Sequence, residues 1–118
     1  MKNATLPPIS IDAAAYLLAV SSRTVSRLIE RGELSAIRIG STLAIASESL
    51  PDLLFRDLEG GCPRPLLTLH DVAGRLACAP EDVRERTADG EFETVQIGRS
   101  TRWSPAAVDR AAQQEQGA

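Results

Sequence analysis

The chain has 118 residues, which is enough for one ordinary domain or for two very small ones. Its hydrophobic fraction of 43% and its charged fraction of 25% are typical of a globular protein and exclude a largely disordered one. The net charge of −3 argues against non-specific coating of nucleic acid, but it is compatible with a local basic patch.

Two helices are predicted near the N-terminus. Residues 1–8 are expected to form a flexible arm, because Pro7 and Pro8 block a helix there. Ser10 can cap a first helix that runs from residue 11 to about residue 20. A second helix over residues 21–31 can be capped by Ser21 or Ser22, and Gly32 follows it where a left-handed residue is expected.

The second helix carries two stripes of side chains. Val25 and Leu28 lie three residues apart and predict a buried face. Arg23, Arg27 and Arg31 recur every four residues and form a basic row beside it. Like charges at this spacing repel by a few tenths of a kcal/mol, so the row indicates either a solvated face or a surface for an extended anion. A nucleic-acid backbone is the extended anion that matches such a row.

A hairpin and a third helix are predicted next. Residues 37–39 and 43–45 alternate apolar and polar side chains around a turn at Gly40, which is typical of a β-hairpin. A short helix is predicted from Ser47 or Ser49 through residue 58, with Pro51 in its first turn. Residues 59–66 are rich in glycine and proline and predict a linker that ends a first unit over residues 9–58.

The sequence then repeats itself. Residues 9–50 align with residues 67–108 without a gap, at an offset of 58 residues. Gly32 and Gly40 recur as Gly90 and Gly98, where the backbone is expected to need a positive φ. We predict a second unit over residues 67–114 with the same elements, followed by a frayed tail at 115–118. Units this small have thin cores, so we expect the two to pack on each other or on partners.

The order helix, turn, helix, hairpin, helix is the plan of a winged helix-turn-helix. The first copy carries Ile9-Ser10, Ala14-Ala15, Leu18, Val20-Ser21, Thr24-Val25, Leu28-Ile29, Gly32-Glu33-Leu34 and Arg38-Ile39-Gly40. The second copy carries Leu67-Thr68, Val72-Ala73, Leu76, Val83, Gly90-Glu91, Val95-Gln96-Ile97-Gly98-Arg99 and Arg102-Trp103-Ser104. On these motifs the chain resembles the excisionase-type and MerR-like small winged helix-turn-helix family, in two tandem copies. The resemblance implies a mostly α fold with small β-hairpins.

The resemblance also implies sequence-specific binding to double-stranded DNA, either in transcription regulation or as a recombination directionality (excision) factor of a phage or mobile element. The first recognition helix would read the major groove, and the second wing would contact the backbone or the minor groove. Capping is an alternative role for Ser22, a structural role is favoured for Thr24, and Arg38 is equally compatible with solvent exposure. The implied DNA contacts are Ser22, Arg23, Thr24, Ser26, Arg27, Arg31, Arg38, Arg99, Ser100, Thr101 and Arg102.

The two copies differ in charge. The slots of the arginine row hold Glu81, Glu85 and Asp89 in the second copy, whereas the second wing is the basic one. These carboxylates indicate either a well-capped, solvated helix or a protein-docking face. Such a face would suit a basic partner such as an integrase, or the arginine row of a neighbouring copy in head-to-tail self-association on DNA. The alternative function is therefore a protein-interaction module that retains the fold.

Enzymatic activity is not expected. The two cysteines and the single histidine cannot supply four zinc ligands, and no nucleophile–base pair or phosphate-binding loop is present. We expect no metal and no cofactor. Core packing, rather than function, is expected for Tyr16, Phe92, Trp103 and Cys78. No apolar stretch approaches the ~20 residues of a membrane span, so we expect a cytoplasmic, nucleoid-associated protein of bacterial or phage origin.

Overall fold

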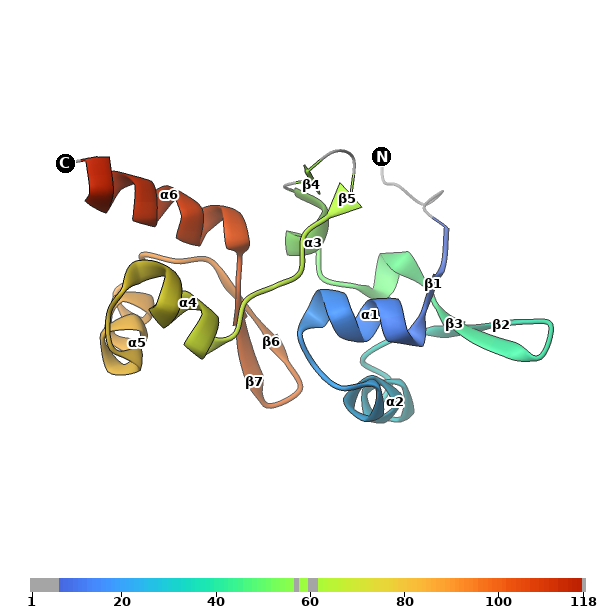
Figure 1. The fold of residues 1–118 in the computed structure, drawn as a ribbon. Helices are drawn as coiled ribbons and strands as arrows, with labels where there is room; N and C mark the ends of the chain where they lie inside the picture. The colour runs from blue at the N-terminus through green and yellow to red at the C-terminus, as the bar shows by residue number, and fades with distance from the viewer. Residues whose placement is uncertain (1–6, 57, 60–61, 118) are drawn as a thin grey trace.

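The computed structural model describes residues 7–56, 58–59 and 62–117. The described chain is mostly helical with small antiparallel sheets, and it is elongated, measuring 53 × 28 × 20 Å (Figure 1). Its first half contains β1 (Ile9–Ser10), α1 (Ile11–Leu18), α2 (Ser22–Glu30), β2 (Ala36–Ile39), β3 (Thr42–Ile45), the 3₁₀ turn η1 (Ser47–Ser49) and α3 (Leu53–Arg56). Its second half contains β4 (Leu58–Glu59), β5 (Cys62–Pro63), α4 (Leu69–Leu76), α5 (Pro80–Ala88), β6 (Thr94–Ile97), β7 (Ser100–Trp103) and α6 (Pro105–Gly117).

The internal repeat is visible in the elements themselves. Each of α4, α5, β6 and β7 begins and ends 58 residues after its counterpart among α1, α2, β2 and β3. Positive φ angles recur at the same offset, at Gly32 and Gly90 after the second helix and at Gly40 and Gly98 in the hairpin turn. The residue that ends the first helix of each half, Ala19 or Ala77, is also left-handed, which the sequence did not indicate.

Local hydrogen bonds explain where the helices begin. Ser10 caps α1, and its side chain accepts a hydrogen bond from the backbone N–H three residues later. Ser21 caps α2 in the same way, so of the two predicted candidates Ser21 rather than Ser22 is the cap. Thr68 and Asp71 form a capping box at the start of α4. Helix α5 has no side-chain cap, but it opens with proline and carries acidic residues in its first turn, where the helix dipole favours them.

Two small hydrophobic cores lie side by side along the molecule. The first is built from α1, α2, β3 and α3, with Leu18, Val25 and Ile45 fully buried. The second is built around Trp103, with Phe92 also buried as expected. Two core expectations do not hold fully, because Tyr16 is 66% exposed and Cys78 is only half-buried at the margin of the second core.

Proline explains why the helix predicted over residues 47–58 does not form. Leu50 is extended, with φ −81° and ψ 156°, because the ring of Pro51 disfavours a helical conformation at the residue before it. The segment becomes the turn η1 and the short helix α3. The opposite error occurs at the C-terminus, where α6 continues to Gly117 through most of the expected frayed tail.

The predicted linker is partly structured. Strands β4 and β5 pair with each other, while residues 60–61 lie outside the described part, as do residues 1–6 of the expected arm. Leu66 is buried in the first core, and its N–H donates to the carbonyl of Leu17 at 2.8 Å. The connection therefore packs against the first half. None of the described helices is long and apolar enough to cross a membrane.

Candidate nucleic-acid interface

The outer face of α2 is basic. Val25 and Leu28 fix the helix on the first core, and this orientation leaves Arg23, Arg27 and Arg31 exposed. Arg31 lies 3.5 Å from the carboxylate of Glu33, and within the described residues Arg23 and Arg27 have no ion-pair partner. Two of the three positive charges are thus not neutralised by the described part of the molecule.

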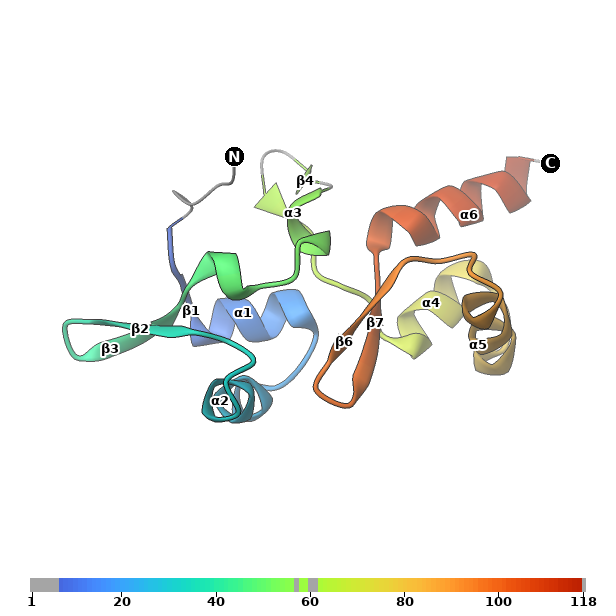
Figure 2. The same cartoon turned by 180° about the vertical axis from the view of Figure 1, so that it is seen from behind.

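The tip of the second hairpin, β6–β7, lies against α2 (Figures 1 and 2). Ile97 is buried in the first core although it belongs to the second half, and a Cβ atom on Gly98 would lie 3.5 Å from Leu28 Cδ2. The same hollow is lined from both elements, by Thr24, Arg27, Leu28, Arg31, Ile97, Gly98, Arg99 and Ser100. The exposed Arg99 therefore extends the basic face of α2.

Arg102, the second arginine predicted for the wing, is half-buried and binds the first half of the chain. Its Nη2 donates to the carbonyl of Ala19 at 2.8 Å, and its Nε donates to the carbonyls of Leu18 and Ala19 at 3.1 and 3.2 Å. These carbonyls are among the last of α1, which lack partners within the helix. The guanidinium therefore caps α1 and joins the two halves, a structural contact that the sequence did not predict.

The environment of Arg102 fits this role. Burial lowers the pKa of the Arg102 guanidinium, and the negative charge of Asp71 partly opposes that effect. The group stays protonated at any physiological pH, because an arginine starts from a very high pKa. A cation near a helix C-terminus is also stabilised by the helix dipole.

The hydroxyl groups near α2 divide between structural and free positions. Ser22 Oγ donates to Asp12 Oδ1 at 2.9 Å, and the Thr24 hydroxyl lies 3.0 Å from that of Ser21 at the cap. Ser26 is exposed between the arginines and makes no side-chain hydrogen bond within the described residues. In the second hairpin, Ser100 and Thr101 are half-buried, and Thr101 donates to Gln96 at 2.6 Å.

The turn end of the first hairpin, β2–β3, projects away from both cores, at the opposite end of the molecule from α5 (Figure 1). Arg38 is exposed on β2 and has no ion pair within the described residues. This hairpin therefore does not bring Arg38 together with the basic face of α2 and Arg99.

The acidic slots of the second half are also on the surface. Glu81, Glu85 and Asp89 are all exposed on α5 or at its C-terminal end. The first of them lies in the first turn, whereas Asp89 is the residue that ends the helix. This row faces solvent within the described structure, as its counterpart on α2 does.

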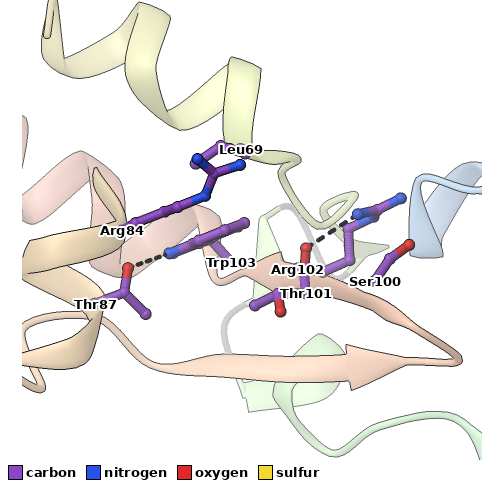
Figure 3. A pocket seen from close by; sticks show the side chains of 7 residues that line it. All are labelled: Leu69, Arg84, Thr87, Ser100, Thr101, Arg102 and Trp103. Atoms are coloured by element: carbon purple, nitrogen blue, oxygen red, sulfur yellow. Dashed lines mark hydrogen bonds between the residues drawn. The ribbon is translucent and has the colours of Figure 1, made fainter. Parts of the chain in front are cut away.

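A second hollow lies between α5 and β7. In this hollow the indole N–H of Trp103 donates to Thr87 Oγ1 at 3.0 Å, and Arg102 donates to the carbonyl of Thr101 (Figure 3). Within residues 7–56, 58–59 and 62–117, no group of three or more His, Cys, Asp and Glu side chains is placed to hold a metal ion. The hollow between α5 and β7 is lined by Leu69, Arg84, Thr87, Ser100, Thr101, Arg102 and Trp103.

Comparison with protein-family models, with curated proteins and with solved structures finds no match to this chain. The sequence pointed to Arg23, Arg27, Arg31 and Arg99, but it did not reveal that Ile97 and Gly98 would pack on α2. The one sequence feature that could have indicated this packing was the apolar Ile97 in an otherwise polar hairpin tip.

Proposed function

We propose that this protein binds double-stranded DNA sequence-specifically as a tandem winged helix-turn-helix protein of the excisionase or MerR-like type. In this proposal α2 enters the major groove, and the tip of the second hairpin contacts the adjoining backbone or minor groove. The biological role would be transcription regulation or control of the excision of a mobile element.

The convergence of exposed arginines from the two halves carries the proposal. Arg23 and Arg27 on α2 and Arg99 on the second hairpin add to one surface in a chain whose net charge is −3. Their positive charges suit the regular negative charge of a duplex, and a single helix fits the major groove. The exposed Ser26 hydroxyl between the arginines supplies a short donor and acceptor for base edges.

The packing of the second hairpin beside α2 also suits sequence-specific DNA binding. A hairpin held on the first half by Ile97 in its core and by Arg102 at the end of α1 keeps Arg99 in the same hollow as Arg27. Contacts to phosphate from two such elements set the register of a helix in its groove, and base contacts then specify the sequence. The second half would thus provide the wing that serves the helix of the first half.

Selection of duplexes from a random pool, followed by affinity measurements on the selected site, tests this proposal. Arg27→Ala is expected to weaken binding by roughly 5- to 150-fold, the loss typical of one base contact. Arg38→Ala is the matched control, because it removes an equally exposed arginine away from the basic face and should change affinity less than about threefold. Equal small effects of both changes, or no duplex bound at low salt, would contradict the proposal.

The exposed acidic row supports a second candidate, a protein-docking module. Glu81, Glu85 and Asp89 would repel phosphates, so α5 is a poor reader of DNA and a reasonable contact for a basic partner such as an integrase or a neighbouring copy's arginine row. Glu85→Arg discriminates between the two uses of α5. Reduced cooperativity or partner binding with unchanged single-site affinity supports docking, whereas lost single-site affinity places α5 on the DNA.

A further inference from the structure

The hollow between α5 and β7 is positively charged. Arg84 and Arg102 both line it, and no aspartate or glutamate is among the described residues that do so. In the hollow beside the linker, by contrast, Asp71 lines the same space as Arg75. Two guanidinium groups without a carboxylate make the hollow between α5 and β7 favourable for an anion.

Two hydrogen-bond donors in this hollow are uncommitted. Arg84 is exposed and has no ion-pair partner within the described residues, and Ser100 makes no side-chain hydrogen bond there. The hydroxyl of Thr87 is bound to Trp103, and that of Thr101 is bound within its own hairpin. Figure 3 shows Arg84 and Ser100 on opposite sides of Trp103, one from α5 and one from β7. A guanidinium and a hydroxyl are both donors that suit the oxygens of a phosphate.

This hollow meets the hollow beside α2 at the tip of the second hairpin. Ser100 lines both, and the hollow beside α2 adds Arg27 and Arg99, again without a carboxylate among its described lining residues. The turn of the second hairpin lies on the same side of the molecule as α2, and α6 lies on the opposite side (Figures 1 and 2). A polyanion bound beside α2 can therefore continue across the hairpin into the second hollow.

We propose that the hollow between α5 and β7 binds a backbone phosphate of the DNA duplex, on the flank of the site that α2 reads, with Arg84 and Ser100 as donors. This inference rests on the proposed function and adds a DNA contact from α5. Arg84 corresponds to Ser26 of the first half, so equivalent positions of the two helices have different tasks. Ser26 reaches base edges in the groove, whereas Arg84 holds the backbone outside it.

The acidic row of α5 limits this contact to the edge of the duplex. Glu81, Glu85 and Asp89 are exposed, and they line neither of the two hollows. They repel phosphates beyond Arg84, so the second half contributes one flanking contact and no second groove contact. Arg84 therefore increases affinity for every sequence alike, and the acidic row remains available for a protein partner.

Hydroxyl-radical footprinting and affinity measurements on a selected duplex with long flanks test the inference. Arg84→Ala is expected to weaken binding about 5- to 10-fold and to reduce the steepness of its salt dependence by about 0.9, the value for one phosphate contact. It should remove protection at one edge of the footprint and leave the centre protected. On a duplex shortened at that edge, the variant and the parent protein should bind equally.

Two further variants separate this contact from a general effect of charge. Arg84→Lys should keep the salt dependence of the parent protein, because an ammonium group retains the charge. Arg110→Ala is the matched control, since it removes an exposed arginine from α6 on the opposite side of the molecule (Figure 1). It should change affinity less than about twofold and leave the footprint unchanged.

Two results would overturn the inference and leave the proposed function intact. In the first, the parent protein binds the selected duplex, and Arg84→Ala has the same footprint and the same salt dependence. In the second, inorganic phosphate at about 10 mM raises the melting temperature of the parent protein but not of Arg84→Ala, while their DNA affinities are equal. The hollow would then be a site for a free anion. A parent protein that binds no duplex at low salt would contradict the proposed function, and this inference with it.

Discussion

At the scale of single residues, Arg102 has the most specific contacts between the two halves. One guanidinium serves three acceptors, the carbonyls of Leu18 and Ala19 at the end of α1 and that of Thr101 in its own hairpin. Ala19 is left-handed, so its carbonyl turns away from the helix and accepts from outside. The contact is therefore a helix cap that happens to come from a distant part of the chain.

Arg102→Ala is expected to lower the free energy of unfolding by about 1–3 kcal/mol, because it leaves these carbonyls without their charged donor. Urea titration followed by circular dichroism measures the change. Arg99→Ala is the matched control, since Arg99 is exposed on the same hairpin, and its effect should stay within about 0.5 kcal/mol. Arg102→Lys should recover only part of the loss, because an ammonium group lacks the fork that spans two carbonyls. Equal stability of the Arg102→Ala and Arg99→Ala variants would show that the cap contributes nothing.

At the scale of elements, the ion pairs of α6 tie it to the rest of the second half. Asp109 on α6 accepts from Arg64 at 2.7 Å and from Arg75 on α4 at 2.8 Å. Burial alone would raise the pKa of the Asp109 carboxyl, but the hydrogen bonds and charges of the two arginines outweigh it and lower this pKa. Because the folded pKa lies below the unfolded one, the stabilisation is present at neutral pH and is lost on acidification.

Asp109→Asn is expected to reduce the free energy of unfolding at pH 7 by up to about 1 kcal/mol, a value that allows for screening of a partly exposed site. The difference from the parent protein should shrink on acidification and disappear once pH has fallen through the lowered pKa of the Asp109 carboxyl, where the parent side chain is itself protonated. Urea titrations at several pH values provide the comparison. A difference that is constant with pH would mean that the ion pairs are not its cause.

Most elements were predictable because the relevant signals are local. Caps such as Ser10 and Thr68 and the turn glycines act within a few residues, and the repeat supplies each signal twice. The interruption of the helix at Leu50, before Pro51, also has a local cause, but the sequence analysis placed Pro51 inside the first turn of a third helix and missed it. The role of Arg102 and the burial of Ile97 were not predictable, because both depend on where the other half lies.

At the scale of the whole molecule, the two copies of the repeat contribute different elements to the basic surface. The first half supplies the basic helix α2, and the second half supplies the hairpin that packs beside it. The acidic α5 and the first hairpin, which has one charged residue, Arg38, would then be left for contacts with proteins. This division explains how a chain with a net charge of −3 can still offer one basic surface.

Arg99→Ala is expected to weaken binding to all duplexes alike and to reduce the steepness of its salt dependence by about 0.9, the value for one phosphate contact on double-stranded DNA. Arg102→Ala should weaken binding through misplacement of the hairpin, and raising protein stability with an osmolyte should partly restore it. Fluorescence anisotropy with a selected and an unrelated duplex separates the two effects. A loss confined to one base position on Arg99→Ala would assign Arg99 to base reading instead.

The salt dependence of DNA affinity in the parent protein tests the central claim most directly. Four exposed arginines on one face, Arg23, Arg27, Arg31 and Arg99, predict a slope of log affinity against log salt between about −2.7 for three phosphate contacts and about −3.6 for four. Because Arg31 already has a partner in Glu33, the steeper end requires that this ion pair opens. A slope near zero, or no binding to any duplex at low salt, would contradict the claim that α2 and the second hairpin form a DNA-binding surface.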